Sequence, residues 1–234
     1  MAETSPETSP DTDPEIDPEI DLVLPCRDEA AALRELLPRV PAGLSVIVVD
    51  NGSTDGTADV ARAQGARVVS ESRPGYGAAV HAGLLAATAP YVVVMDGDGS
   101  FDPAAALPLV ETVRRDEADL ALGCRRSVAA GVQPWHARVG NRLVLAALRR
   151  RTGLQVRDIA PLRAARREAL LGLGVEDRRS GYPVELLDRA ARAGWRVLEI
   201  DVDYHPRTAG TRSKVSGSVR GSLLAAYDFW RVLS

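Results

Sequence analysis

The sequence predicts an α/β fold, in which a mostly parallel sheet carries helices on both faces within a single domain. Two observations lead to this prediction. Short apolar, β-branched runs alternate with stretches of about a dozen residues whose apolar positions have helical spacing. Several runs end in a polar residue followed by glycine, which is typical of a turn after a strand. The predicted strands cover residues 21–25, 44–49, 67–70, 91–95 and 118–122.

The helices between these strands have their own signals. Leucine and valine recur at helical spacing over residues 33–40, and residues 51–57 supply Ser, Thr and Asp that can cap a helix running to about residue 64. Residues 195–204 alternate between apolar and charged side chains, as in an edge or antiparallel strand. Residues 216–233 fit a helix that either closes the core or lies at a membrane interface.

Composition divides the 234-residue chain into two parts. Residues 1–20 are acidic and rich in proline, which predicts a disordered tail ahead of a folded domain at 21–234. Eight of the 32 acidic residues lie in residues 1–21, which leaves 24 against 29 basic residues in the remainder. A modestly basic body suits a phosphate-bearing partner, although a solvated surface is the commoner cause. We do not expect nucleic acid to be that partner.

Cysteine content and hydropathy bear on the compartment. The two cysteines form no Cys-x-x-Cys pair, and no secretory signal is visible, so we expect a cytoplasmic protein. No apolar run approaches the roughly 20 residues of a membrane-spanning helix. We therefore expect no membrane span.

The segment 91–103 contains the strongest chemical signal. A buried-strand pattern ends in Asp96 and Asp98, and alternate residues of an extended segment point the same way, so both carboxylates can converge on one point. A cation bound between the two carboxylates relieves their repulsion. Mg²⁺ and Mn²⁺ prefer oxygen ligands, and substrate phosphates often complete their coordination shell. An EF-hand loop is excluded by Phe101 and Leu107 at two of its required positions, whereas a plain polar turn stays an alternative.

Other strand ends add to this signal. Pro25, Asp50 and Arg125 also fall where predicted strands finish, and ligands of such sheets bind outside the carboxyl ends of the strands. The segment 75–77 (Gly-Tyr-Gly) is either a helix N-terminus facing a phosphate or a plain turn, because the third glycine of a dinucleotide fingerprint is missing.

Taken in order, these motifs resemble a known family. The chain over about residues 21–233 is similar to inverting family 2 glycosyltransferases of the GT-A fold, and most similar to their dolichol-phosphate mannose synthase and polyprenyl-phosphate glycosyltransferase branch. The motifs that carry the resemblance lie at residues 25–29, 49–57, 96–103, 123–126 and 207–214.

The resemblance implies a role for each matching residue. The residues implied to line the nucleotide's base and ribose are Pro25, Arg27, Glu29 and Asp50. Asp96 and Asp98 are implied to be a DxD pair that holds Mg²⁺ or Mn²⁺ against the diphosphate of a nucleotide-sugar donor. The residues implied to contact the diphosphate or an acceptor phosphate are Arg125, Arg138, Arg207, Ser213 and Lys214, with the 207–214 loop as a lid.

Three positions depart from the family pattern. Ser100 stands where many relatives carry Gln beside the metal, and Asn51 replaces a frequent second Asp. Residues 160–163 (Ala-Pro-Leu-Arg) replace a usual Ser/Thr-Gly-Phe-Arg, which affects the expected acceptor pocket. We expect none of the C-terminal transmembrane helices that some relatives carry.

The acceptor decides whether a general base is needed. A phosphate acceptor, such as a polyprenyl phosphate at the inner face of the membrane, is already ionised at neutral pH and needs none. A hydroxyl acceptor requires a carboxylate to take its proton, for which Glu185 is the first candidate and Asp158 the second, although each can equally be a structural acid paired with an arginine. The predicted catalytic residues are Asp98, Glu185, Arg207 and Lys214.

Two other functions stay open. A sugar-nucleotide pyrophosphorylase has a similar strand pattern, but its glycine-rich, arginine-containing loop is replaced here by residues 26–32 (Cys-Arg-Asp-Glu-Ala-Ala-Ala). A non-catalytic nucleotide-sugar-binding protein would retain the pocket without turnover.

Overall fold

The structure is a computed structural model that describes residues 19–128, 135–208, 227–229 and 231–232. Its strands are β1 (Ile20–Cys26), β2 (Leu44–Asp50), β3 (Arg67–Ser70), β4 (Tyr91–Val94), β5 (Leu120–Ser127), β6 (Leu162–Arg166) and β7 (Val197–Tyr204). Its α-helices are α1 (Ala30–Leu36), α2 (Thr57–Ala63), α3 (Tyr76–Ala86), α4 (Ala106–Arg114), α5 (Trp135–Thr152), α6 (Arg167–Gly172) and α7 (Tyr182–Arg192). Short 3-10 helices cover Leu37–Arg39 and Pro103–Ala105.

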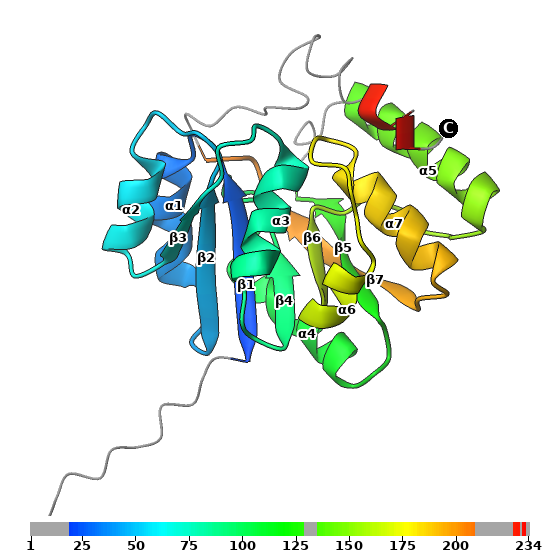
Figure 1. Cartoon of the computed structure of the whole chain (residues 1–234), viewed down its shortest axis with the longest axis horizontal. Coiled ribbons are helices and arrows are strands. Elements are labelled where there is room, and N and C mark those ends of the chain that lie inside the picture. Colours follow the sequence, from blue (N-terminus) through cyan, green and yellow to red (C-terminus); the bar gives the residue numbers. More distant parts are fainter. Residues whose placement is uncertain (1–18, 129–134, 209–226, 230, 233–234) are drawn as a thin grey trace, which may run out of the picture.

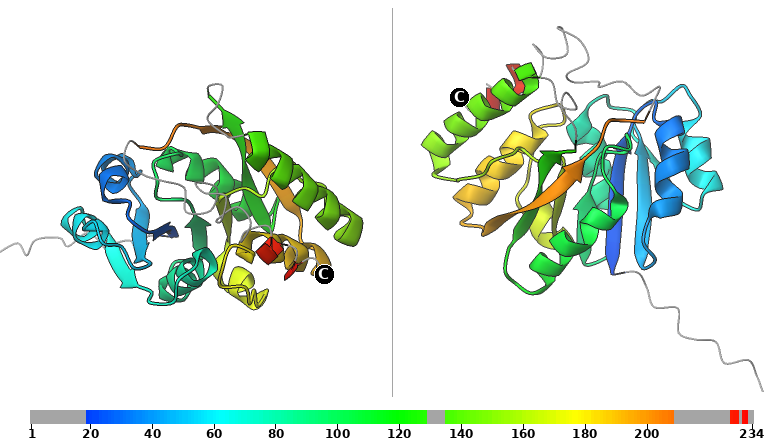
Figure 2. Two further views of the ribbon diagram at one scale, coloured as in Figure 1. Left: turned by 90° about the horizontal axis from the view of Figure 1, so that it is seen from above. Right: turned by 180° about the vertical axis from the view of Figure 1, so that it is seen from behind.

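Within the described residues the strands form one seven-stranded sheet in the order β3-β2-β1-β4-β6-β5-β7. The pairs β1–β2, β1–β4, β2–β3 and β5–β7 are parallel, whereas β6 runs antiparallel to both β4 and β5. Helices cover both faces, as Figures 1 and 2 show. The predicted mostly parallel α/β architecture is confirmed.

Two apolar layers hold the sheet between the helices. One contains leucines and valines of α1 and α4, and the other contains those of α3, α6 and α7. The inner strand β1 contributes to both layers, because its alternate residues Leu22 and Val23 point to opposite faces and neither is accessible to solvent. This two-sided burial explains the apolar runs within β1, β2 and β4.

Three strands differ from the sequence-based expectation. The predicted fifth strand (118–122) continues to Ser127 in β5, beside the acidic strand β7. Residues 162–166, for which no strand was predicted, form β6. Residues 197–204 do form the last strand of the described sheet, but they run parallel to β5, so the antiparallel alternative is wrong.

Two predictions concern segments that lie mostly outside the described residues. Residues 1–18 of the predicted tail lie outside the described residues, and β1 begins at Ile20, one residue before its predicted start. Only five residues of the 216–233 segment are described, so its helix stays a prediction. None of the helices in the described part of the chain has the length and hydropathy needed to cross a bilayer.

Candidate active site

The Asp96/Asp98 segment leaves the sheet directly after β4. Val94 of β4 pairs with Val23 of β1, and the two strands are parallel. The segment therefore lies at the same edge of the sheet as the end of β1, which we call the rim. Gly97 lies between the two acids, and a Cβ added there would overlap the Sγ of Cys26 at the end of β1. Only glycine allows the turn to approach β1 this closely, and the turn places both aspartates at the carboxyl end of the parallel strands.

Asp98 is the more deeply buried of the two aspartates and contacts three described residues. Its Oδ2 lies 2.7 Å from Nε of Arg207, its Oδ1 accepts a 3.0 Å hydrogen bond from the backbone N–H of Ser100, and its backbone carbonyl accepts one from Thr208. Burial alone would lower the pKa of Arg207, but the Asp98 charge and further interactions with Tyr204 and Asp96 together outweigh burial, and the pKa rises. The segment 207–208 is therefore fastened to the Asp96/Asp98 turn.

Asp96 is held in an environment short of positive charge. Burial, followed by the nearby Asp98 carboxylate, raises the pKa of Asp96 to about 6, and this rise persists although Arg207, Arg163 and Arg125 all act against it. An additional cation beside the two carboxylates would relieve this electrostatic cost.

The residues present fit a divalent ion shared with a substrate. Among the described residues there is no group of three or more His, Cys, Asp or Glu that could hold a metal, so Asp96 and Asp98 would supply only part of an oxygen shell. Mg²⁺ and Mn²⁺ are commonly held in this way, with substrate phosphates and water completing the shell. Beside Asp98, the fully buried Oγ of Ser100 has no hydrogen-bond partner among the described residues, so this hydroxyl also has unused hydrogen-bonding capacity.

The residues predicted to face the nucleotide gather at the ends of β1 and β2. Pro25 and Asp50 lie at the ends of these paired strands, Arg27 is exposed in the loop that follows β1, and Glu29 is buried immediately before α1. Asp50 Oδ1 accepts a 3.0 Å hydrogen bond from the backbone N–H of Ser53. The structure thus brings these four predicted residues to one corner of the rim.

Asn51, which departs from the family pattern, organises the loop between β3 and α3. Its Nδ2 donates to the carbonyls of Glu71 (2.9 Å) and Arg73 (2.8 Å), and its Oδ1 accepts from the N–H of Gly75 (2.9 Å). An aspartate could accept from Gly75 but could not donate to the two carbonyls. The substitution therefore has a structural function.

Arg125 and Asp158 form a buried ion pair. The Nε and Nη2 of Arg125 donate to the two oxygens of Asp158 at 2.7 and 2.6 Å, and the Arg125 backbone N–H donates to the same carboxylate. Burial would raise the pKa of Asp158, but these hydrogen bonds and the Arg125 charge outweigh it and hold the pKa below its ordinary value. Of the two alternatives for Asp158, these contacts match the structural acid.

Glu185 is also occupied by structural contacts. Its carboxylate accepts hydrogen bonds from the backbone N–H groups of Glu176 (3.0 Å) and Asp177 (2.6 Å) and pairs with Arg189 at 2.6 Å. These bonds fasten the segment before α7 to the first turn of that helix. They match the alternative of a structural acid and argue against a general base.

Of the remaining predicted contacts to phosphate, one is exposed on α5 and two lie outside the described residues. Arg138 is exposed on α5. Ser213 and Lys214 lie outside the described residues, so their roles stay predictions.

Sequence reasoning missed two residues around the aspartates. Arg163 on β6 is only 3% exposed, lies over the ring of Tyr76 at 6.0 Å, and opposes the rise in the Asp96 pKa. Tyr204, at the end of β7, packs on Phe101 (5.3 Å between ring centroids) and under the Arg125 guanidinium. The one available signal was an arginine within the otherwise small and apolar segment 160–165.

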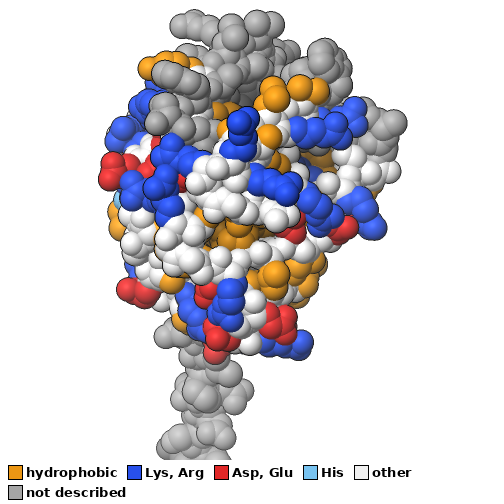
Figure 3. Space-filling model, turned by 90° about the vertical axis from the view of Figure 1, so that its right-hand side faces the viewer, with side chains coloured by type: hydrophobic (Ala, Val, Ile, Leu, Met, Phe, Trp, Pro, Cys, Tyr) orange, Lys and Arg blue, Asp and Glu red, His pale blue; other side chains and the backbone are white. Residues whose placement is uncertain are grey.

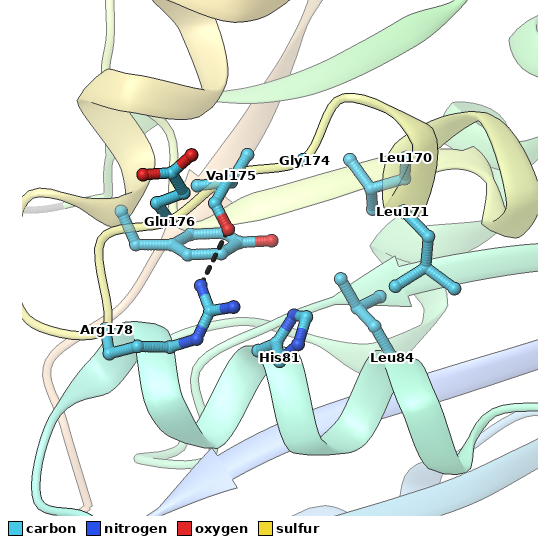
Figure 4. A pocket seen from close by; sticks show the side chains of 9 residues that line it. His81, Leu84, Leu170, Leu171, Gly174, Val175, Glu176 and Arg178 are labelled. Atoms are coloured by element: carbon cyan, nitrogen blue, oxygen red, sulfur yellow. Dashed lines mark hydrogen bonds between the residues drawn. The ribbon is translucent and has the colours of Figure 1, made fainter.

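A separate cavity of about 130 Å³ lies between α3, α6 and the segment before α7 (Figure 4). Arg178 crosses it and donates to the Val175 carbonyl at 2.6 Å, and burial, followed by the Arg178 charge, lowers the pKa of His81. None of the predicted site residues lines this cavity. We assign it no part in the chemistry.

The sheet is mostly parallel and has helices on both faces, and two carboxylates follow β4 next to the ends of β1 and β2. This arrangement defines a GT-A type glycosyltransferase. Comparison with known proteins gives the family. The model of glycosyl transferase family 2 matches residues 21–173, and the chain belongs to this family.

Individual relatives support the same assignment. An uncharacterised glycosyltransferase of Mycobacterium tuberculosis is 59% identical over 213 residues, which cover 91% of this chain and 97% of that protein. The polyprenol monophosphomannose synthase of Mycolicibacterium smegmatis is 32% identical over 216 residues, covering 84% and 81%. The structure of glucosyl-3-phosphoglycerate synthase from Mycobacterium tuberculosis with Mn²⁺, UDP and glucosyl-3-phosphoglycerate matches with a TM-score of 0.69 at 27% identity, covering 92% and 78%.

Proposed function

We propose that this glycosyltransferase moves a sugar from a nucleotide-diphosphate sugar to a polyprenyl phosphate, with inversion and with Mg²⁺ or Mn²⁺ held by Asp96 and Asp98. The observation that supports the proposal is that both candidate bases are already engaged in hydrogen bonds and ion pairs. Asp158 is paired with Arg125, and Glu185 is bound to Arg189 and to two backbone N–H groups. A phosphate acceptor requires no base, so this arrangement suits it better than a hydroxyl acceptor.

The donor end of the site suits a diphosphate. The bound ion would neutralise the charge of the departing nucleoside diphosphate, a contribution worth several kcal/mol in such reactions. Arg207 reaches the same place from the end of β7, and its guanidinium is held there by Asp98. A guanidinium close to where charge develops further stabilises the leaving group. Pro25, Arg27, Glu29 and Asp50 would then orient the nucleoside.

Relatives support the two ends of the reaction. The M. tuberculosis synthase of similar structure has been solved with UDP together with Mn²⁺. The M. smegmatis relative is named as a polyprenol monophosphomannose synthase. We propose on this basis a peripheral position at the inner face of the membrane, where a lipid acceptor is available.

A transfer assay tests the proposal. The purified protein is incubated with UDP- or GDP-sugars, a detergent-solubilised polyprenyl phosphate and Mg²⁺ or Mn²⁺, and the glycolipid is separated from free sugar. We expect Asp98→Asn to lower transfer by at least about 1,000-fold, as the loss of several kcal/mol of leaving-group stabilisation implies. Asp59→Asn, an exposed acid on α2, is the matched control.

Metal binding is measured independently of turnover. The electron paramagnetic resonance signal of free Mn²⁺, titrated with protein and UDP, should report binding to the wild type and weaker binding to Asp98→Asn. Transfer that survives both Asp98→Asn and chelation by EDTA would refute the metal role. Glycosylation of 3-phosphoglycerate instead of the lipid would refute the acceptor, and pyrophosphate release from a nucleoside triphosphate and sugar phosphate would identify a pyrophosphorylase.

A further inference from the structure

Helix α5 is unusual in charge. Residues 135–152 contain five arginines (Arg138, Arg142, Arg149, Arg150 and Arg151) and no acidic residue. Arg151 forms an ion pair with Asp188 of α7 at 3.0 Å. For Arg142, Arg149 and Arg150, the structure records no ion pair with any described residue.

The two faces of α5 differ in burial. Leu145 and Leu148 are at most 8% exposed and join the helix to the body of the protein. On the opposite side, Leu143 is 67% exposed and Val139 44% exposed, so Leu143 keeps most of its surface in water and Val139 keeps nearly half. At 3.6 residues per turn, Arg142 and Arg149 lie along one edge of this exposed strip and Arg150 lies within it.

Helix α5 lies towards the functional end of the molecule. Figures 1 and 2 place α5 beyond α7, towards the end of the sheet where the parallel strands finish. Asn141 on α5 accepts a 3.2 Å hydrogen bond from the N–H of Ile159 and donates to the carbonyl of Arg157. Between these two residues lies Asp158, the partner of Arg125. The side of the molecule seen in Figure 3 shows Lys and Arg side chains interspersed with hydrophobic ones.

We propose that the outward face of α5, formed by Val139, Arg142, Leu143, Arg149 and Arg150, docks on the surface of an anionic lipid bilayer. Arginines attract acidic headgroups, and exposed leucine and valine side chains gain by entering the boundary between headgroups and acyl chains. This inference deepens the proposed function, because a polyprenyl phosphate is itself embedded in a bilayer. The bilayer then lies beside the rim that holds Arg125.

Charge selects a bilayer over another copy of the chain. In a two-fold dimer formed through α5, the arginines of one copy would face those of the other without acids between them. Like charges placed opposite one another disfavour such an interface. An anionic lipid surface is complementary to the same strip.

Vesicle flotation of the full chain tests the proposal, without any donor or acceptor. We expect the protein to float with vesicles of equal parts phosphatidylcholine and phosphatidylglycerol, and not with phosphatidylcholine alone. The triple variant Arg142→Gln/Arg149→Gln/Arg150→Gln should bind the anionic vesicles on the order of 100-fold more weakly. The control Arg62→Gln/Arg115→Gln/Arg192→Gln removes the same charge from exposed positions on α2, directly after α4 and on α7, and should bind as the wild type does.

A single apolar change separates insertion from charge. Leu143→Asn should weaken vesicle binding about tenfold, because one leucine side chain loses its burial in the bilayer. Three results would each overturn the proposal. They are an equal loss of vesicle binding in both triple variants, equal binding of the wild type to uncharged vesicles, and a change of oligomeric state in place of vesicle binding. A protein that transfers sugar to a polyprenyl phosphate in detergent but does not float retains the proposed function and loses this inference, and a protein that floats without transfer shows the reverse.

Discussion

Replacement of Asp158 by asparagine tests whether this acid has a structural role. The Asp158 and Arg125 side chains are 6% and 18% exposed, and the guanidinium donates two hydrogen bonds to the carboxylate. Removing one member of a buried ion pair leaves the other charge uncompensated, which typically costs about 3–5 kcal/mol. Asparagine keeps one acceptor oxygen and a similar volume, so we expect a loss near the lower end, about 3 kcal/mol. This loss is a large fraction of the ~5–15 kcal/mol that keeps a domain folded.

Urea unfolding followed by far-UV circular dichroism measures this loss, with Asp203→Asn as the control. Asp203 pairs with Arg126, the next residue along β5, but these side chains are 51% and 71% exposed, so we expect no measurable change. The lowered pKa of Asp158 means that its contribution is present above the unfolded-state pKa and lost as pH falls through the folded-state pKa. The two curves should therefore converge below about pH 4.

One result would refute this reasoning. If Asp158→Asn unfolds at the urea concentration of the wild type, yet loses transfer to a hydroxyl acceptor, then Asp158 is a general base and the Arg125 pair is incidental.

Three further predictions follow from the geometry of the turn and of α7. Gly99 has a φ of 80°, and an added Cβ would overlap Thr208, so Gly99→Ala should cost about 1–2 kcal/mol in backbone strain and also sharply reduce transfer by displacing Arg207. Gly56→Ala, with a φ of 83° and nothing within 4 Å, should show the strain alone, and equal activity of the two variants would contradict the explanation. Glu185→Gln should lower the free energy of unfolding by about 1–3 kcal/mol while turnover of folded enzyme stays unchanged, whereas unchanged stability with lost turnover would restore its role as a base. Because the pKa of Asp96 is raised to about 6, its contribution to stability is present below about pH 4 and lost as pH rises through 6. In the same urea assay, Asp96→Asn should therefore reduce the fall in unfolding free energy with rising pH and gain ~2 kcal/mol at pH 8. An unchanged dependence of the unfolding free energy on pH would exclude Asp96 as the source of this fall.

The sequence predicted the parallel half of the sheet better than the other half. Strands β1, β2 and β4 are continuous apolar runs that end in a polar turn, and local pattern alone identifies such strands. β6 reads Leu-Arg-Ala-Ala-Arg, which has neither β-branched residues nor a clear alternation. It becomes a strand because β4 and β5 both pair with it, and this pairing is visible only in the tertiary structure.

The candidate site shows the same limit. The spacing of Asp96 and Asp98 and their place after a strand predicted their common position. The Arg125 partner of Asp158 and the backbone partners of Glu185 were not predictable, since these contacts join segments of different elements, whereas Arg189 lies four residues after Glu185 on the same helix. Arg125 precedes Asp158 by 33 residues, and the backbone N–H groups bound by Glu185 belong to a loop eight and nine residues earlier.

The position of β6 has a consequence for synthesis of the chain. β4 and β5 are separated by a strand that is translated after both of them. A nascent chain that stops before residue 162 therefore presents unpaired edges on two apolar strands, which favours self-association. The segment matched by the family model extends to residue 173, just past this late strand, and a shorter fragment would be a poor choice for recombinant expression.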